Sequence, residues 1–326
     1  MNQELTSANQ ISELPEETDR ELDLAISQTD RDLGSSDIAA SIGVVNPDGK
    51  WTGATGVSDL ETQQPTQPDD LFNIGSISKS YTSAVILKLQ EQGKLSLDDT
   101  FDKWLPDLAA EIPGSEDLTI RQLLNGTGGL YDYANNEEFQ SDSATDYLSG
   151  SNRDWQPEDL VAYAFDKPLF SGARSTDKWT YTNTGNVVAA LIAESATRKS
   201  FARILTEEIL KPLGLENTFF TTEDVDVADR ARGYDDITSG VDSSLDRDGV
   251  LEDYTNLNTD WAYGAGSIVS TSEDVAIFFN SLASGELLSP ESTAEIFNYV
   301  DTGFERDNPE YSREQLGLGV FPKNYP

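Results

Sequence analysis

Histidine and cysteine are both absent from this chain of 326 residues. Without histidine, the sequence cannot build a Ser-His-Asp triad or a metal site with imidazole ligands. Without cysteine, it has no thiolate nucleophile, no cysteine-ligated zinc and no disulfide. The sequence therefore predicts no metal centre, and a catalytic serine in this chain would need a base other than histidine.

Basic residues are scarce as well, with 22 Lys and Arg against 59 Asp and Glu, which gives a formal charge of −37. Such a chain repels phosphate backbones and acidic lipid surfaces, so we expect no nucleic-acid partner. An excess of acid also suits a protein that stays soluble in concentrated salt, because salt screens the self-repulsion. An ordinary acidic surface and adaptation to high salt explain this composition equally well.

Long apolar runs are missing too. The best candidate for a membrane helix, 187–193, has seven residues, whereas a span needs about 20. The first 17 residues contain neither a basic n-region nor an apolar h-region, so they do not form a signal peptide. The single methionine opens the chain, which fits a native start and equally a start placed before a mature exported chain. Hydrophobic residues still make up 37%, which is typical of a globular protein.

The order of expected elements predicts an α/β (α+β) fold in two regions. Apolar periodicity indicates helices, and apolar stretches between turn residues indicate strands. The expected helices are 16–33, 119–124, 186–194, 201–210, 272–282 and 290–300, and the expected strands or apolar segments are 38–45, 51–57, 267–270 and 317–321. We expect residues 1–97 and 261–326 to form an α/β region with a sheet. Residues 98–260 would form a mostly helical region, with the active site between the two.

One stretch, FNIGSISKSYTSAVILKLQEQGKLSLDD at residues 72–99, carries the strongest chemical signal. On a helix that begins near Gly75 and stops at Gly93, Ser76 and Lys79 share one face, one turn apart. Burial and the positive end of the helix both disfavour an ammonium group, so they lower the pKa of such a lysine. A neutral Lys79 could then accept the proton of Ser76, which would make a Ser-Lys nucleophile pair.

The S-x-x-K pattern is weak by itself. A capping serine followed by a surface lysine explains it equally well, and residues 175–178 repeat it in a stretch that we interpret as a loop. A second pattern favours the catalytic interpretation, because Tyr181 and Asn183 would point the same way from an extended segment. The tyrosine could serve as a second base and acid, and the asparagine could orient a carbonyl group or the lysine. Alone, Y-x-N is more often a turn that caps a helix.

Five stretches in order give the chain a specific resemblance. They are FNIGSISKSYTSAVILKLQEQGKLSLDD, TIRQLLNGTGGLYDYAN, WTYTNTGNVVAALIAE, ILKPLGLENTFF and DWAYGAGSIVSTSEDVAIFFNSLASGELLS. Together, across roughly residues 20–321, they resemble the penicillin-recognising serine hydrolases, which include D-alanyl-D-alanine carboxypeptidases, class C β-lactamases and related esterases. Within this group the chain is most similar to the secreted D-alanyl-D-alanine carboxypeptidases.

The resemblance implies a β-lactamase/DD-peptidase-like fold and a role for each matching residue. Ser76 would be acylated, Lys79 would be its base, and Tyr181 would pass the proton to the leaving amine. Asn183 would bind the substrate amide, and the backbone N–H of Ser76 would form half of the oxyanion hole. Trp155 and Trp261 match aromatic walls of the cleft, although core packing explains either tryptophan equally well.

The resemblance also implies partners and a location. The substrate would be a D-Ala-D-Ala peptide, a β-lactam or an ester, with no cofactor. The location would be extracellular or periplasmic, with the cytoplasm still open.

Three departures from the family stand out. Gly126-Thr127-Gly128-Gly129 replaces the frequent His-Thr-Ser-Gly, and Phe321 falls near the place of the arginine that binds the substrate carboxylate in carboxypeptidases. The family's third motif, His/Lys-Thr/Ser-Gly on a strand, follows shortly after a stretch like Gly317-Leu318-Gly319, but this chain ends at Pro326. We therefore expect an incomplete sheet, and a fragment of a longer protein rather than a shortened or swapped variant.

Three functions stay open at this point. A serine hydrolase acting on D-Ala-D-Ala peptides or β-lactams leads, and an esterase on the same scaffold fits the missing arginine. A non-catalytic binding module fits the missing third motif, but intact Ser76, Lys79 and Tyr181 argue against it. Residues 246–249 (DRDG) resemble part of a calcium loop, but in a loop counted from Ser244 the twelfth position is Thr255 rather than glutamate, so we interpret them as an acidic surface loop.

Overall fold

The structure is a computed structural model that describes residues 11–33, 39–149, 153–170, 179–220, 230–235, 251–255, 259–301 and 315–320. Helices and small antiparallel sheets make up the described residues, so the predicted α+β class is confirmed. The chain divides into two compact units. Unit 1 comprises Met1–Ile74, Leu210–Leu257 and Ile268–Leu287, and unit 2 comprises Gly75–Ile209, Asn258–Ser267 and Leu288–Pro326. The predicted boundaries after residues 97 and 260 stay a prediction.

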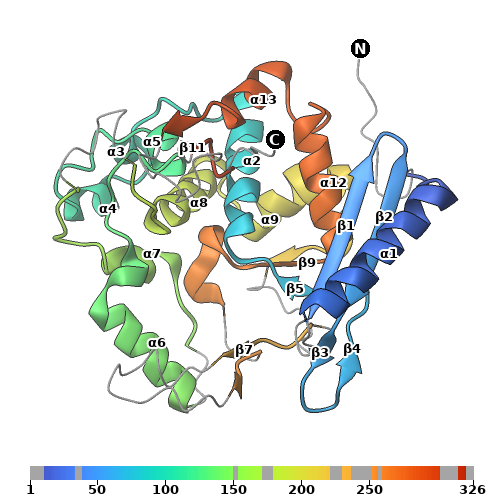
Figure 1. The fold of residues 1–326 in the computed structure, drawn as a ribbon. Coiled ribbons are helices and arrows are strands. Elements are labelled where there is room, and N and C mark those ends of the chain that lie inside the picture. The colour runs from blue at the N-terminus through green and yellow to red at the C-terminus, as the bar shows by residue number, and fades with distance from the viewer. Residues whose placement is uncertain are drawn as a thin grey trace. The chain divides into compact units, whose positions relative to one another are not determined.

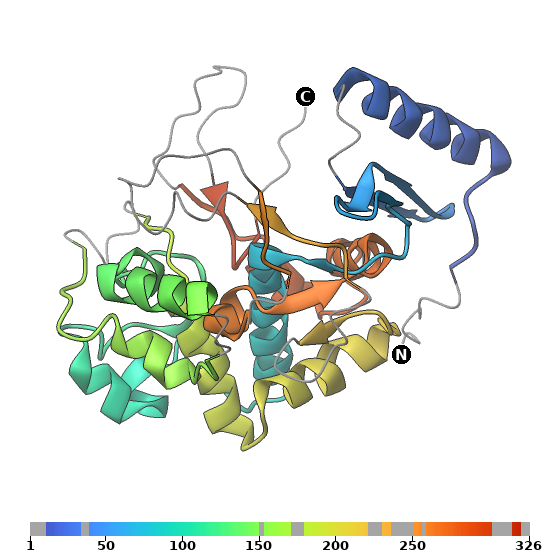
Figure 2. The same cartoon turned by 90° about the horizontal axis from the view of Figure 1, so that it is seen from below.

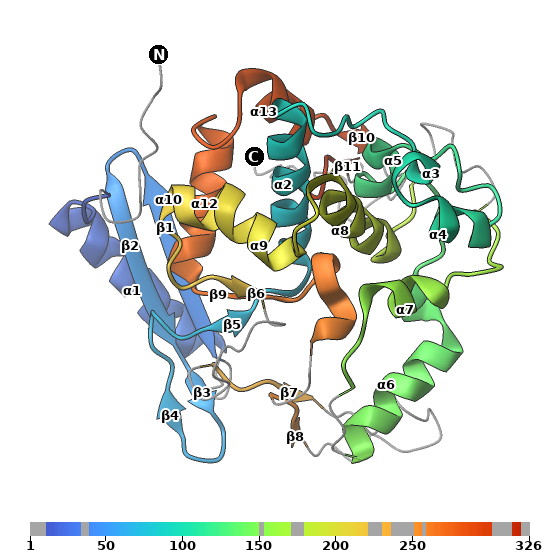
Figure 3. The ribbon, with the colours of Figure 1, turned by 180° about the vertical axis from the view of Figure 1, so that it is seen from behind.

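Unit 1 contains the hairpin β1–β2, a sheet in the order β5–β9–β6, and the strand pairs β3–β4 and β7–β8 (Figure 3). Its elements are α1 (Glu16–Leu33), β1 (Ala40–Asn46), β2 (Gly49–Thr55), β3 (Val57–Asp59), β4 (Gln64–Pro65), β5 (Phe72–Asn73), α10 (Lys211–Leu213), β6 (Phe219–Phe220), β7 (Tyr234–Asp235), β8 (Glu252–Asp253), β9 (Ile268–Ser270) and α12 (Ser272–Ala283). The predicted strands near 38–45 and 51–57 and the helices 16–33 and 272–282 are therefore confirmed, with shifts of one or two residues at their ends, and the predicted apolar segment 267–270 contains strand β9.

The hairpin turn is closed by the side chain of Asn46. Its Oδ1 accepts the backbone N–H groups of Asp48 at 2.8 Å and of Gly49 at 3.1 Å. Asparagine favours such turns because its short side chain can replace a backbone acceptor. The β1–β2 ladder then runs without a break from Asn46↔Gly49 to Ala40↔Thr55.

Helices α1 and α12 cover opposite faces of the hairpin (Figures 1 and 2). On the α1 face, Trp51 forms a buried cluster with Leu14 and Ile26. On the α12 face, a Cβ at Gly43 would lie 2.3 Å from the carbonyl oxygen of Ser272, so only glycine permits this approach. Residues that alternate along a strand point to opposite faces, which is why one hairpin can carry two helices.

Unit 2 is mainly helical. Its elements are η2 (Gly75–Ile77), α2 (Ser78–Glu91), α3 (Phe101–Trp104), α4 (Pro106–Glu111), α5 (Ile120–Leu124), η3 (Tyr133–Asn135), α6 (Glu137–Ser149), α7 (Pro157–Ala162), α8 (Thr184–Thr197), α9 (Phe201–Leu205), the π turn η4 (Thr206–Leu210), η6 (Asp260–Ala265), α13 (Pro290–Ile296), β10 (Val300–Asp301) and β11 (Gln315–Leu316). The predicted helices at 119–124, 186–194 and 201–210 are confirmed. None of the described helices is long and apolar enough to cross a membrane.

Helix α2 lies in the core of unit 2. It packs against α8 and α9 (Figure 3), and every residue from Ser78 to Leu87 is buried. Polar residues are buried here together with apolar ones, and several of the polar side chains find acceptors in unit 2. Thr82, for example, donates to the carbonyl oxygen of Gly264 at 2.6 Å. The predicted stop is confirmed, since Gly93 adopts a φ of +68°.

The last expected elements differ from the structure. Helix α13 ends at Ile296, and β10 begins where the prediction continues the helix. The predicted strand 317–321 is wrong for residues 317–320, because the N–H of Gly317 bonds to the carbonyl oxygen of Val320 in a turn with Gly319 at a φ of +69°. Phe321 lies outside the described residues.

Candidate functional site

Ser76 lies in the first turn of the η2–α2 segment. Gly75 precedes it with a φ of +51°, a left-handed conformation that glycine adopts without strain. The N–H groups of a first helical turn have no acceptor within the helix, so they remain available to a ligand. Ser76 itself is exposed, which suits a nucleophile that must reach a substrate.

Lys79 is buried one turn further on, with 6% of its surface exposed. Its Nζ lies 3.1 Å from Ser76 Oγ, 2.7 Å from Asn183 Oδ1 and 2.9 Å from the carbonyl oxygen of Ala265. Burial lowers the pKa of Lys79 to about 8, although the negative charge of Asp132 opposes this shift. The predicted meeting of Ser76 and Lys79, and the predicted direction of the pKa shift, agree with this geometry.

The three partners of Lys79 suit a neutral amine. The oxygens of Ala265 and Asn183 can only accept hydrogen bonds, and a neutral amine has two N–H groups and one lone pair. When its two N–H groups serve these two acceptors, the lone pair faces the hydroxyl of Ser76. The same position also holds the ammonium form, which would donate to all three oxygens.

Tyr181 contacts the same serine. Its phenol oxygen lies 2.5 Å from Ser76 Oγ, and its ring centroid lies 4.9 Å from Lys79 Nζ. Burial raises the pKa of Tyr181, and the hydrogen bond to Ser76 lowers it to a smaller extent. The phenol therefore stays protonated at neutral pH, so it can donate a proton rather than act as a resting base.

Asp132 is a site residue that the sequence analysis missed. The amide nitrogen of Asn183 donates to both carboxylate oxygens of Asp132 at 3.2 Å, and its backbone N–H donates to the same carboxylate at 3.1 Å. Because a carboxylate only accepts, the NH₂ side of Asn183 must face Asp132 and the oxygen must face Lys79. Asn183 is the N-cap residue of α8, but its side chain makes no capping bond, so capping does not explain this residue.

Local hydrogen bonds hold Asp132 in place. Its side chain accepts the N–H of Ala134 and so caps η3. Thr184, at the start of α8, donates to the carbonyl oxygen of Tyr131 at 2.7 Å and accepts the N–H of Tyr133 at 3.1 Å. From the sequence, Asp132 predicts only a local cap at Ala134. Its role becomes visible through Asn183, which lies 51 residues later in the chain.

The glycine at position 126, where the family frequently has histidine, has a structural reason. Gly126 adopts a φ of +74°, and a Cβ at this position would lie 2.5 Å from Nε1 of Trp179. The N–H of Thr180 donates to the carbonyl oxygen of Gly126 at 3.0 Å. A larger residue, such as the family's frequent histidine, would displace the segment that leads to Tyr181.

The two predicted tryptophans belong to an aromatic cluster around Phe139. Trp155 is 6% exposed, and its ring centroid lies 5.4 Å from that of Phe139 and 4.4 Å from the guanidinium carbon of Arg153. Trp261 lies 6.0 Å from Phe139, and its carbonyl oxygen accepts the hydroxyl of Tyr133. Among the described contacts, none joins Trp155 to Ser76 or Lys79, so its role as a cleft wall stays a prediction, as does that of Trp261.

Two further sequence matches lie outside the described residues, namely the second S-x-x-K at 175–178 and the DRDG stretch at 246–249. Within the described ranges, no group of three or more acidic residues could hold a metal ion. The expectation of a chemistry without metal or cofactor stays a prediction.

Comparison with known proteins places these observations in a family. A family model described as Beta-lactamase matches residues 36–326. The chain is 28% identical over 284 residues to "Penicillin-binding protein 4*" of Bacillus subtilis, covering 82% of this chain and 59% of that protein. It is 25% identical over 262 residues to "Teichoic acid D-alanine hydrolase" of Staphylococcus aureus, covering 80% and 58%. The chain thus spans less than two thirds of the length of these curated relatives.

A solved structure agrees with the family model. The D-stereospecific amidohydrolase from Streptomyces sp. superposes with a TM-score of 0.76 at 28% identity, over 90% of this chain and 80% of that one. The predicted β-lactamase-like fold and the predicted membership of the penicillin-recognising hydrolases are therefore confirmed. This chain belongs to the β-lactamase family of serine hydrolases.

Proposed function

We propose that the chain is an acyl-serine hydrolase of the D-alanyl-D-alanine carboxypeptidase and penicillin-binding type. The observation that carries the proposal is the position of Ser76 Oγ, which lies 3.1 Å from Lys79 Nζ and 2.5 Å from the phenol of Tyr181. Covalent acyl transfer requires a nucleophile with a base and an acid within hydrogen-bond reach of it. The names of three relatives, a penicillin-binding protein, a D-alanine hydrolase and a D-stereospecific amidohydrolase, support a substrate with a D-amino acid.

Acylation would proceed in two steps. Neutral Lys79 takes the proton of Ser76 as Oγ forms a bond with the substrate carbonyl carbon, and the oxyanion is stabilised by backbone N–H groups such as that of Ser76. The carbon–nitrogen bond then breaks as Tyr181 donates its proton to the leaving nitrogen, and the proton on Lys79 restores the phenol. Water would later attack the acyl-serine with the same groups acting in reverse.

Asp132 would act as a positioning residue in this reaction. It holds Asn183 by three hydrogen bonds, and Asn183 in turn presents its oxygen to Lys79. Its charge also raises the pKa of Lys79, so it limits how far burial can lower it. The balance of these two effects leaves a lysine that is partly neutral near pH 8.

An esterase is the second candidate. The sequence has Phe321 near the place where carboxypeptidases of the family carry the arginine for the substrate carboxylate. A site without that arginine would discriminate less strongly in favour of peptides with a free carboxyl end. Esters also need less help for the leaving group than amides do, so they would be cleaved by a less complete site.

Intact-mass spectrometry after incubation with benzylpenicillin tests the proposal. We expect one acyl adduct on the chain and none on Ser76→Ala. Ser175→Ala, which alters the second S-x-x-K, is the matched control and should acylate normally. Turnover of a D-Ala-D-Ala peptide, its L-Ala-L-Ala counterpart and a short nitrophenyl ester then separates the candidates.

Each outcome has one meaning. An adduct together with D-specific peptide cleavage supports the carboxypeptidase type. Ester turnover without an adduct or peptide cleavage supports the esterase. A folded protein with no adduct and no turnover would contradict both and leave the non-catalytic module.

A further inference from the structure

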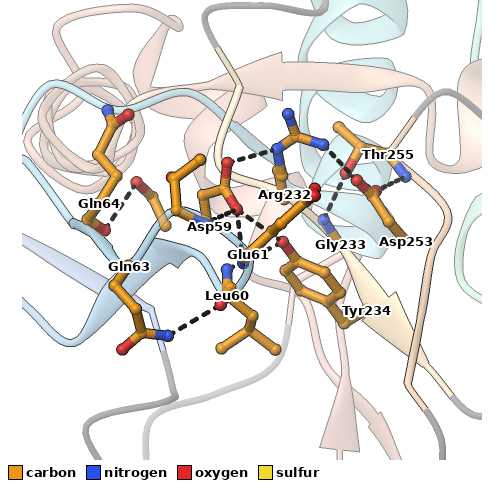
Figure 4. A network of polar contacts seen from close by, with 12 residues as sticks. Asp59, Leu60, Glu61, Gln63, Gln64, Arg232, Gly233, Tyr234, Asp253 and Thr255 are labelled. Atoms are coloured by element: carbon orange, nitrogen blue, oxygen red, sulfur yellow. Dashed lines mark hydrogen bonds and ion pairs between the residues drawn. The ribbon is translucent and has the colours of Figure 1, made fainter.

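Two arginines of unit 1, two residues apart in the chain, have very different partners. Arg232 pairs with two carboxylates, since its Nε lies 3.0 Å from Asp59 and its Nη1 donates to Asp253 (Figure 4). Arg230 instead donates to the amide oxygen of Asn73 at 3.1 Å and to the carbonyl oxygen of Thr255 at 3.0 Å. Both of these partners are neutral, and none of the described acidic residues forms an ion pair with Arg230.

The lack of a described counter-charge for Arg230 contrasts with the acidity of the chain. Acidic residues outnumber basic ones by 59 to 22, so a carboxylate partner would be easy to supply. Burial lowers the pKa of Arg230, and its Nε is buried without a hydrogen-bond partner. A guanidinium has five N–H donors, and it stays charged at any physiological pH. Arg230 is thus a partly desolvated cation, and not all of its N–H donors are used by the described residues.

A cavity of about 420 Å³ lies beside this arginine. Phe72, Leu60, Tyr234 and Tyr254 contribute to its walls, and Arg230 and Arg232 are the charged groups among its described lining residues. No aspartate or glutamate is among those lining residues. The volume lies within the range of about 300–1,000 Å³ that is typical of small-molecule sites.

A neighbouring cavity gives a direct contrast. It has a volume of about 490 Å³ and shares Arg230 and Arg232, but Asp59, Asp69 and Asp70 also line it. These three carboxylates would repel an anion, whereas the charged groups among the described lining residues of the first cavity are both cationic. The charge of the two linings therefore selects the first cavity as the place for an anion.

We propose that the cavity beside Arg230 binds a small organic carboxylate with an aromatic or aliphatic body. The planar guanidinium matches a carboxylate in geometry, and the apolar walls would enclose the rest of the molecule. The site lies wholly within unit 1, so the proposal does not depend on the chemistry of Ser76. The reaction proposed for Ser76 does not account for this cavity, because neither Ser76 nor Lys79 nor Tyr181 is among its described lining residues.

Isothermal titration calorimetry with 3-phenylpropionate tests the site. All proteins would carry Ser76→Ala, so that no turnover disturbs the heats, and the neutral isostere 3-phenylpropionamide is the matched ligand. We expect the carboxylate to bind at least tenfold more tightly than the amide. Arg230→Gln should weaken carboxylate binding at least tenfold, whereas Arg203→Gln, which removes an exposed arginine paired with Glu207, should change it less than twofold.

The contradicting results are equally definite. Equal affinity for the acid and the amide, or undiminished binding by Arg230→Gln, would overturn the proposal, as would the absence of binding to a folded Ser76→Ala protein. If Arg230→Gln does not fold, Arg230→Lys preserves the positive charge but loses the fork of the guanidinium, and it should bind more weakly than the parent. The comparison of acid with amide on the parent decides the case without any variant.

Discussion

Lys79 and Arg232 are both cations in a strongly acidic chain, yet their surroundings differ in kind. Lys79 is buried among neutral acceptors, and Asn183 links it to the carboxylate of Asp132. Arg232 is partly exposed and contacts two carboxylates directly (Figure 4). The pKa of Lys79 falls to about 8, whereas the hydrogen bond to Asp253 and the nearby negative charges raise the pKa of Arg232. Burial among neutral acceptors favours the neutral form of a basic side chain and pairing with carboxylates favours the charged form, and only the lysine can become neutral near physiological pH.

Neutral acceptors have a specific consequence for Lys79. They supply hydrogen bonds to the amine without the negative charge that would stabilise an ammonium. Carboxylates supply both the hydrogen bonds and the negative charge. In a pair such as Arg232–Asp59 the guanidinium therefore keeps its charge, and the pair holds neighbouring segments together. The substitutions that follow alter the surroundings of one of these two cations or exchange the two side-chain types.

The largest effect is expected at the nucleophile. Ser76→Ala removes the atom that forms the acyl bond, so the rate of ester or peptide hydrolysis should fall roughly 10³-fold or more. Steady-state kinetics measure this loss, and circular dichroism confirms that the variant is folded. Activity that persists in Ser76→Ala at the parent rate would show that another group is acylated.

Lys79→Arg makes the lysine resemble Arg232. The charge remains, but a guanidinium does not become neutral in the accessible pH range, so the base is lost and kcat should fall by about 10²- to 10⁴-fold. The reciprocal change, Arg232→Lys, should alter kcat less than about twofold, because it touches a structural pair. Loss of activity in both variants to the same extent would contradict the distinction between them.

Asp132→Asn removes the carboxylate whose charge raises the pKa of Lys79. Without it, Asn183 loses its fixed orientation and kcat should fall by about tenfold to a hundredfold. Because the charge of Asp132 raises the pKa of Lys79, its loss lowers that pKa, and the acid limb of the pH–rate profile should move to lower pH.

A matched control for this change is Asp59→Asn, which removes the carboxylate beside Arg232 instead. It should leave the acid limb where it is in the parent protein. A limb that moves to higher pH in Asp132→Asn, or moves equally in both variants, would contradict the assignment of Asp132.

The smallest effect is expected for Arg232→Gln. The variant leaves Asp59 and Asp253 without their shared cation, so the melting temperature should fall by a few degrees. Activity per folded molecule should change less than about twofold. Differential scanning calorimetry and kinetics on the same sample measure both quantities. A loss of activity without a loss of stability would contradict the purely structural role of Arg232.

Local patterns were sufficient to predict much of this molecule. Helix α1 and the β1–β2 hairpin follow from apolar spacing and the Asn46 turn, which involve only neighbouring residues. Ser76 and Lys79 lie one helical turn apart, so their contact also follows from spacing. The ordered motifs then located Tyr181 and Asn183 correctly beside them.

Features that depend on distant partners could not be predicted in the same way. Asp132 looks like a local cap, and its contact with Asn183 exists only because Thr184 ties residues 131–133 to the start of α8. The neutral partners of Arg230 likewise lie far from it in the chain, since Asn73 is 157 positions away and Thr255 is 25 positions away. The sequence left Trp155 as either a cleft wall or a core residue. Its contact with Phe139, 16 residues away in the chain, depends on the tertiary structure.

The most direct test of the central claim is a titration of Lys79 itself. Carbon-13 NMR of protein labelled at the lysine Cε, with Lys79→Arg to assign the signal, reports the pKa of this amine. We predict that Lys79 titrates near pH 8, because it is buried among neutral acceptors, whereas an unperturbed lysine titrates at about 10.4. A signal assigned to Lys79 that titrates with the other lysines would contradict it, because the amine would then be protonated when Ser76 needs a base.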